Sequence, residues 1–157
     1  MMELEKLWPG EEREGKRSLF LLNEQQIHHY WGDLEKELSR TRMYDHWRPE
    51  QILEQLTNGA MQCWALSNGE IQLILISDIL VYSNGSRSLR FVGCVGRELD
   101  TYLPLIRSSF AKVTKRLECG RVEVVGREGW ARKLKKLGFK HLYTVVYFDL
   151  EPLPREH

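Results

Sequence analysis

Residues 126–150 read GREGWARKLKKLGFKHLYTVVYFDL, and this stretch predicts a short helix followed by a strand. Trp130, Leu134 and Leu137 recur at helical spacing and predict a buried stripe. Gly138 then predicts a left-handed helix end, with Phe139 folding back onto the core. The apolar run that follows predicts a strand. The opposite face of the helix would present basic side chains to solvent: Arg132, Lys133, Lys135 and Lys136.

Strong local signals also mark the first third of the chain. Ser18–Leu22 predicts a strand, and Asn23 followed by Gln26 is typical of a capping pair that opens a helix. A second helix is expected after Trp47, with Pro49 in its first turn and Asn58-Gly59 as its stop. The first helix has an apolar stripe of Ile27, Trp31, Leu34 and Leu38.

The middle of the chain predicts an antiparallel meander of three strands. Two apolar runs, Met61–Leu66 and Glu70–Tyr82, flank Asn68-Gly69, a dipeptide that readily supplies positive φ in a hairpin turn. A second turn at Asn84-Gly85 leads to a strand over Ser88–Val95.

The second half adds helices between strands. A long amphipathic helix is expected over Asp100–Leu117, with Pro104 in or before its first turn and Gly120 at its end, before a β-branched strand over Arg121–Val125. The predicted order is β-α-α-β-β-β-α-β-α-β. Such an order indicates an α/β chain with a mixed α+β sheet, parallel where the last two helices cross over.

The whole chain has 157 residues, which suits one folded domain. We divide it into an N-terminal arm (1–17), a domain (18–150) and a C-terminal tail (151–157). No apolar run approaches the roughly 18 residues of a membrane span. The acidic N-terminus does not resemble a signal peptide, so a cytoplasmic location is expected.

The cysteines and histidines do not predict a metal site. Cys63, Cys94 and Cys119 lie far apart and form no C-x-x-C pair, so we interpret them as small buried hydrophobic residues. His28-His29 and His46 have no partners at ligand spacing.

Charge is unevenly distributed although the net charge is only +1. Residues 105–140 hold eleven basic and three acidic residues. Basic residues at this density could bind the phosphates of a cofactor, a nucleic acid across residues 107–140, or an acidic protein. A solvated helix face is the alternative interpretation.

The order of elements and the quoted stretch together resemble the GNAT superfamily of acyl-CoA N-acyltransferases. After the strand over Arg121–Val125 come Arg127, Trp130, Lys133-Leu134 and Gly138-Phe139, at the spacing of that family's closing motif. Upstream, CWALSNGEIQLILI and RSLRFVGCVG are similar to its second to fourth strands. The form G-R-x-G-W-x-R-x-L-x-x-x-G-F is also similar to GNAT-like proteins carried by tailed bacteriophages.

The resemblance implies an acyl-CoA site between the fourth strand and the third helix. Active members hold the pyrophosphate on the amides of a Gly-rich loop at a helix N-terminus. The corresponding loop here adds Glu98 and Asp100, whose charges oppose phosphates, while Arg97 offsets one of them. If coenzyme A binds, the implied contacts are Cys94, Val95, Gly96, Arg97, Arg127 and Trp130.

Several positions depart from the family's pattern. The Tyr that protonates the departing thiolate falls at Leu134, which has no proton to donate. The family's Asn near the pantetheine arm falls at Arg127, and its small Ala at Trp130, whose bulk could fill the groove. Eleven residues separate Phe139 from Leu150, too few for the usual closing pair of strands.

The best-placed candidate for a catalytic base is Glu123, on the strand over Arg121–Val125. Its alternative interpretation is an outward-facing carboxylate. Cys94 is not expected to act as a nucleophile, because nothing nearby in the sequence would lower its pKa.

These observations lead to a hypothesis and two alternatives. The hypothesis is a GNAT-fold protein with a degenerate acetyl-CoA site and no expected cofactor, serving as a structural or assembly subunit of a bacteriophage particle with other protein chains as partners. The first alternative is an active N-acetyltransferase that uses acetyl-CoA and an unknown amine. The second is nucleic-acid binding through the basic stretch, for which no recognised motif is present.

Overall fold

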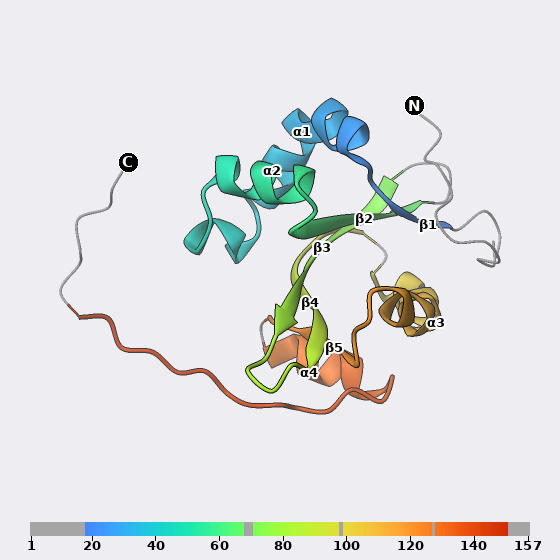
Figure 1. Ribbon diagram of the computed structural model, residues 1–157, viewed down its shortest axis with the longest axis vertical. Coiled ribbons are helices and arrows are strands. Elements are labelled where there is room, and N and C mark those ends of the chain that lie inside the picture. Colours follow the sequence, from blue (N-terminus) through green and yellow to red (C-terminus); the bar gives the residue numbers. More distant parts are fainter. Residues whose placement is uncertain (1–17, 68–70, 98, 127, 151–157) are drawn as a thin grey trace.

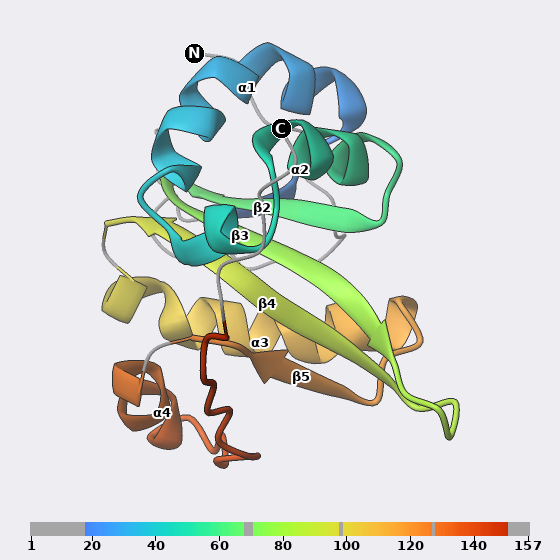
Figure 2. The same ribbon diagram turned by 90° about the vertical axis from the view of Figure 1, so that its left-hand side faces the viewer.

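The computed structural model describes residues 18–67, 71–97, 99–126 and 128–150, in which helices cover both faces of a five-stranded sheet (Figures 1 and 2). The predicted arm (1–17) and tail (151–157) lie outside the described residues. The strands are β1 (Ser18–Leu21), β2 (Met61–Ser67), β3 (Ile71–Val81), β4 (Arg87–Gly96) and β5 (Arg121–Val124). The helices are α1 (Glu24–Leu38), η1 (a 3-10 turn, Arg42–Asp45), α2 (Pro49–Thr57), α3 (Leu99–Arg116) and α4 (Glu128–Lys135).

The sheet has the mixed topology that the sequence predicts. Its strands lie in the order β1-β2-β3-β4-β5, and the first four are antiparallel neighbours. Strand β5 runs parallel to β4 because the intervening α3 carries the chain back across the sheet. Strand pairing here joins Ser88–Phe91 of β4 to Arg121–Val124 of β5.

Two apolar layers hold the sheet between the helices. Alternation along β3 sends Ile74 and Ile76 toward α1 and α2, and Leu73 and Leu75 toward α3. Figure 2 shows α1 and α2 on one face and α3 on the other. This burial on both faces explains why β3 reads as an almost continuous apolar run.

Local capping signals predict the element boundaries well. The Asn23 side chain accepts a hydrogen bond from the Gln26 amide at 2.8 Å, and the Gln26 side chain accepts one from the Asn23 amide at 2.9 Å. Pro49 begins α2, as expected. At the second turn Gly85 has φ +85°. The turn at Asn68-Gly69 lies outside the described residues.

The prediction that Pro104 falls in or before the first turn of its helix is wrong. The helix α3 begins at Leu99, and Pro104 lies inside it, beyond the first turn. Proline there removes one intrahelical hydrogen bond. The helix continues because Tyr102, Phe110 and Val113 are buried against the sheet, and this packing outweighs the lost bond.

The end of α4 confirms the interpretation of Gly138. Its φ is +90°, the Gly138 amide donates to the Lys135 carbonyl at 3.1 Å, and the Phe139 amide donates to the Leu134 carbonyl at 3.2 Å. These two bonds form a Schellman motif, which requires a residue without steric penalty at positive φ.

The strand predicted after Gly138 is not formed in this chain. Residues 139–150 pair with no strand, and Figure 1 shows them running outward from the body of the molecule. Their large apolar side chains are exposed, up to 86% at Phe148. The β-branched and aromatic residues of this stretch favour a strand, but a strand forms only where a neighbouring strand supplies its hydrogen bonds.

Candidate functional site

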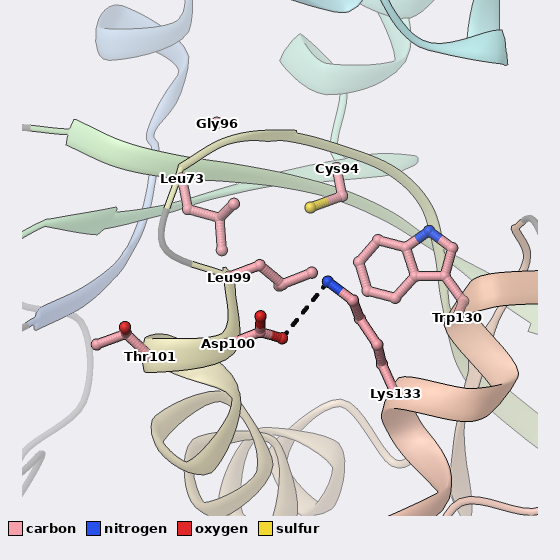
Figure 3. Close-up of a pocket in the computed structure, with 8 residues that line it drawn as sticks. All are labelled: Leu73, Cys94, Gly96, Leu99, Asp100, Thr101, Trp130 and Lys133. Atoms are coloured by element: carbon pink, nitrogen blue, oxygen red, sulfur yellow. Dashed lines mark ion pairs between the residues drawn. The ribbon is translucent and has the colours of Figure 1, made fainter.

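A cavity of about 640 Å³ lies where the C-terminal half of β4 meets α3 and α4 (Figure 3). A volume of this size suits a small-molecule ligand, for which cavities of roughly 300–1,000 Å³ are typical. Its lining comes from four elements: Leu73 of β3, Cys94 and Gly96 of β4, Leu99, Asp100 and Thr101 of α3, and Trp130 and Lys133 of α4.

The cavity forms because β4 and β5 separate from each other. Their parallel ladder ends at Phe91, apart from a hydrogen bond from the Val125 amide to the Phe91 carbonyl at 3.0 Å. Strand β4 continues to Gly96 and stays paired with β3. Among the described residues, no strand lies against the other edge of β4 after Phe91, so that edge offers backbone groups to a ligand.

Two glycines allow the close approaches that shape the cavity. Gly96 has φ +128°, and a side chain there would collide with the Gln72 carbonyl of β3. A Cβ at Gly126 would lie 2.6 Å from Cδ1 of Trp130. The glycine before α4 therefore lets the Trp130 indole lie against the chain and form one wall of the cavity.

Part of the wall is apolar. In Figure 3 the Cys94 thiol and the Trp130 indole point into the same space, beside Leu99. Burial raises the pKa of the Cys94 thiol to about 11, although the charge of Lys133 lowers it. A thiol with this pKa is protonated at neutral pH, so Cys94 serves as wall rather than as nucleophile.

One ion pair crosses the mouth of the cavity. Lys133 Nζ of α4 lies 3.5 Å from Asp100 Oδ1 of α3, and the two side chains are 50% and 76% exposed (Figure 3). An exposed pair contributes only about 0–1 kcal/mol, so an anionic ligand could displace Asp100 from Lys133 at small cost. The first turn of α3 adds a partial positive charge here.

The structure brings together some of the predicted cofactor contacts. Cys94, Gly96 and Trp130 line the cavity, whereas the Val95 side chain packs on the opposite face with α1 and α2. The Arg97 amide already donates to the Gln72 carbonyl at 2.7 Å. Arg127 lies outside the described residues, as does Glu98.

The sequence interpretation missed Leu73, Leu99, Thr101 and Lys133 as cavity residues. Lys133 was expected to face solvent. A signal was available, because Lys133 lies three residues after Trp130 and such positions share a helix face. The other three depend on how β3, β4 and α3 meet, which no local pattern encodes.

Glu123 lies away from this cavity. It sits on the sheet face opposite Val122 and Val124, which pack on the α3 side. Tyr82 donates a hydrogen bond to its carboxylate at 2.7 Å, and Arg121 Nε lies 3.6 Å from Oε2. Its role as a base therefore stays a prediction.

The neighbours of Glu123 keep it ionised. Burial is the largest single influence and raises the pKa, but hydrogen bonds from Ser88 and Tyr82 and the charges of Arg121 and Arg90 together outweigh it. The net result is a pKa below the ordinary value of 4.5. At neutral pH this residue is a carboxylate with its oxygens already hydrogen-bonded.

Other features of the described residues bear on the remaining expectations. Cys63 and Cys119 are buried and Cys94 is half-buried, as expected of small hydrophobic residues. Within those residues we find no cluster of three or more His, Cys, Asp or Glu that could hold a metal ion, and no helix long and apolar enough to cross a membrane. Basic side chains are exposed on α3 and α4: Arg107, Lys112, Lys115, Arg116, Arg132, Lys133 and Lys135.

Comparison with known proteins finds likeness in structure but not in sequence. No family model matches the chain, and no curated protein matches it. An aminoglycoside acetyltransferase from an uncultured soil metagenomic sample, solved with trehalose, superposes with TM-score 0.63 at 10% identity, covering 89% of this chain and 100% of that one. A predicted acetyltransferase from Clostridium acetobutylicum, solved with acetyl-CoA, gives TM-score 0.60 at 9% identity, covering 85% and 96%.

A ribosomal-protein-alanine N-acetyltransferase from Brucella melitensis biovar Abortus 2308 gives TM-score 0.59 at 11% identity, covering 86% of this chain and 98% of that one. The protein therefore has the GNAT acetyltransferase fold, with a mixed five-stranded sheet and four α-helices in its described residues. The bacteriophage association gains no support from these structures. At such low identities the likeness defines the fold and leaves substrates open.

Proposed function

We propose that this protein is an acyl-CoA-dependent N-acyltransferase that binds its acyl donor in the cavity between β4, α3 and α4. The observation that carries the proposal is the position of that cavity, at the place where β4 separates from β5 and α3 begins. The fold supports it, because the similar Clostridium protein was solved with acetyl-CoA.

The residues present fit a coenzyme A molecule in two respects. Leu73, Leu99 and Trp130 offer an apolar wall for the pantetheine arm. Lys133 and the first turn of α3 offer positive charge for a phosphate. Asp100 opposes a phosphate at the same place, so binding would require Lys133 to exchange its carboxylate partner for the ligand.

Bound acetyl-CoA would supply a thioester, from which a neutral amine takes the acyl group as the C–N bond forms and the C–S bond breaks. The attacking amine must lose a proton, and the sequence prediction assigns this to Glu123, which is ionised at neutral pH but lies outside the cavity lining. Leu134 is buried and has no ionisable proton, so this side chain cannot protonate the departing thiolate.

Calorimetric titration with coenzyme A tests the binding site. Lys133→Ala should weaken binding about tenfold, by removing a charge-assisted contact. Lys135→Ala is the matched control, since Lys135 is an exposed lysine of the same helix that does not line the cavity. Equal effects of the two substitutions, or no saturable binding to the unaltered protein, would contradict the proposal.

Calorimetric titration of the Asp100→Ala variant with coenzyme A is a second test of the binding site. Removing the carboxylate frees Lys133 and lessens repulsion, so coenzyme A should bind more tightly than to the unaltered protein. Unchanged affinity would mean that the ion pair does not compete with the ligand, and that the phosphate binds elsewhere.

Turnover is tested separately, by following release of free coenzyme A thiol from acetyl-CoA in the presence of a panel of primary amines. Amine-dependent release that falls with Lys133→Ala and not with Lys135→Ala would support the acyltransferase. Binding without release with every amine tested would keep the coenzyme A site but contradict the proposed acyl transfer.

The second candidate is a GNAT-fold scaffold with a degenerate site, serving an assembly such as a bacteriophage particle. Two features support it: Asp100, at a position where the family resemblance implies a phosphate, is paired with Lys133, and Leu134 falls where the resemblance implies a Tyr. Absence of any thermal stabilisation by saturating coenzyme A would support this candidate, since a ligand of the native state must stabilise it.

A further inference from the structure

Most of the charge on α3 and α4 is positive. Residues 101–117 and 129–140 hold nine basic residues and no acidic residue, and all nine basic side chains are exposed. Acidic residues flank these ranges in the sequence at Asp100, Glu118 and Glu128, and Asp100 is paired with Lys133. We call the nine residues the basic face: Arg107, Lys112, Lys115, Arg116, Arg132, Lys133, Lys135, Lys136 and Lys140.

The two helices bring their basic residues to one surface. The ion pair between Lys133 and Asp100 joins α4 to the first turn of α3. Farther along, Arg107 Nη2 of α3 lies 3.9 Å from the position of a Cβ added at Gly138, which ends α4. These two contacts place the helices side by side, so the basic side chains of α4 extend the row on α3.

Helix stability explains only part of this charge. Basic side chains in the last turn of a helix interact favourably with its dipole, and Lys115 and Arg116 of α3 are so placed. Arg107 and Lys112 lie before that turn, where the dipole offers little. Among the described residues, Lys112 and Lys115 form no ion pair. The basic face therefore carries more charge than the helix ends require.

The chemistry of the basic face argues against a protein or a membrane as its partner. Protein interfaces have an apolar centre from which lysine is depleted. The exposed large hydrophobic residues among those described are Val81, Val125 and members of 142–150, none of them on α3 or α4. A helix that binds a membrane surface must insert its apolar side, but Tyr102 and Phe110 bury that side of α3 against the sheet. Figure 1 shows the apolar residues after α4 running away from α3.

A phosphate backbone needs only what this face provides. Lysine and arginine neutralise phosphates and release counterions without any apolar contact. Single strands differ, because proteins bind them largely by stacking bases on exposed aromatic residues. Among the described residues α3 and α4 expose none, since Tyr102 and Phe110 are buried and Trp130 lines the cavity.

The length of the row on α3 fits duplex DNA. From Arg107 to Lys115 the helix advances about 12 Å, at a rise of about 1.5 Å per residue. The major groove of DNA is also about 12 Å wide, so the row can reach phosphates of both strands. The major groove of an RNA duplex is narrower.

We propose that the basic face of α3 and α4 is a docking surface for the phosphate backbone of duplex DNA, bound without readout of its sequence. Charge complementarity and the one-signed surface of two adjacent helices carry the assignment. This proposal does not depend on acyl transfer, because of the nine residues only Lys133 lines the cavity.

Fluorescence anisotropy with a labelled DNA duplex of random sequence, repeated at several salt concentrations, tests the surface. The full chain should bind with a slope of log Kobs against log salt of about −4, as expected for about four contacted phosphates. Lys112→Ala/Lys115→Ala should make this slope shallower by about two and weaken binding at low salt at least about tenfold. Alanine favours a helix, so the variant should keep its fold, which circular dichroism verifies. No saturable binding by the unaltered chain, or a slope near zero, would overturn the proposal.

The matched control removes two positive charges from the other face of the sheet. Lys36 lies in the last turn of α1 and Arg40 just after it, and both are exposed. Lys36→Ala/Arg40→Ala should leave the slope and the affinity nearly unchanged. If the two double variants lose affinity equally, net charge rather than the basic face governs binding and the assignment fails.

Other ligands distinguish the alternative occupants. Lys112→Ala/Lys115→Ala should bind coenzyme A as the unaltered chain does, since neither residue lines the cavity. Equal losses of affinity for coenzyme A and for the duplex would mean that the face serves the cofactor, which refutes DNA docking. Tighter binding of a single strand of equal length, of anionic phospholipid vesicles or of polyglutamate than of the duplex would refute it as well.

Discussion

At the scale of single residues, Gly96 is the position where this fold is least tolerant. Its φ of +128° is unfavourable for any residue with a side chain, and a Cβ would meet the Gln72 carbonyl. Gly96→Ala should therefore lower the free energy of unfolding by about 1–3 kcal/mol in urea denaturation. Gly32→Ala is the control: its added Cβ meets nothing in α1, so stability should rise by about 0.5–1 kcal/mol. A rise in both variants would contradict the strain argument.

The Tyr82–Glu123 hydrogen bond predicts a pH-dependent contribution to stability. Because the pKa of Glu123 is lowered in the folded state, its contribution is present above about 4.5 and is lost as pH falls through the folded value. Tyr82→Phe removes one of the bonds that lower this pKa. The variant should be less stable than the unaltered protein at neutral pH, and the difference should shrink on acidification below 4.5.

Tyr44→Phe controls for the loss of a hydroxyl group. Tyr44 donates to the Glu35 backbone carbonyl at 3.0 Å, which does not titrate. Its effect on unfolding in urea should stay constant across the same pH range. If the two variants lose stability in parallel as pH falls, Glu123 is not the group responsible.

At the scale of elements, the boundaries set by local chemistry could be predicted from the sequence, and those set by partners could not. Asn23 with Gln26, Pro49 and Gly138 each fix a helix end through bonds within a few residues. The strand expected after Gly138 needs a neighbour that this chain does not place beside it. Pro104 was misplaced because burial of Tyr102 and Phe110 overrides a local penalty.

The Schellman motif at the end of α4 should contribute measurably to stability. Gly138→Ala forces a side chain into φ +90° and should cost about 1–2 kcal/mol in urea denaturation. Gly129→Ala, in the same helix and with open space around its Cβ, should cost nothing and could stabilise the helix. Equal stability of the two variants would mean that α4 ends without the left-handed residue.

At the scale of the whole molecule, the candidate site arises from topology rather than from a motif. Cys94, Gly96 and Trp130 could be nominated from the sequence because a family resemblance placed them. Leu73 and Lys133 join them only because β4 separates from β5 and lets α3 and α4 converge on the gap. The α3 crossover and the end of the β4–β5 pairing depend on contacts between residues far apart in the sequence. Local periodicity carries no information about such contacts.

The same topology predicts where the molecule opens first. Strands β2, β3 and β4 are paired on both sides and buried between two apolar clusters. By contrast, β5 pairs over only four residues, and α4 is shorter than the 12–15 residues that a helix needs to be stable alone. Native-state hydrogen exchange should therefore give β5 and α4 amides at least about tenfold lower protection than those of β3.

Strand β1 is the control. It is an edge strand that also has four residues, but its Leu19 and Phe20 are buried, so it should be better protected than β5. Uniform protection across all five strands would show instead that the sheet opens as one cooperative unit.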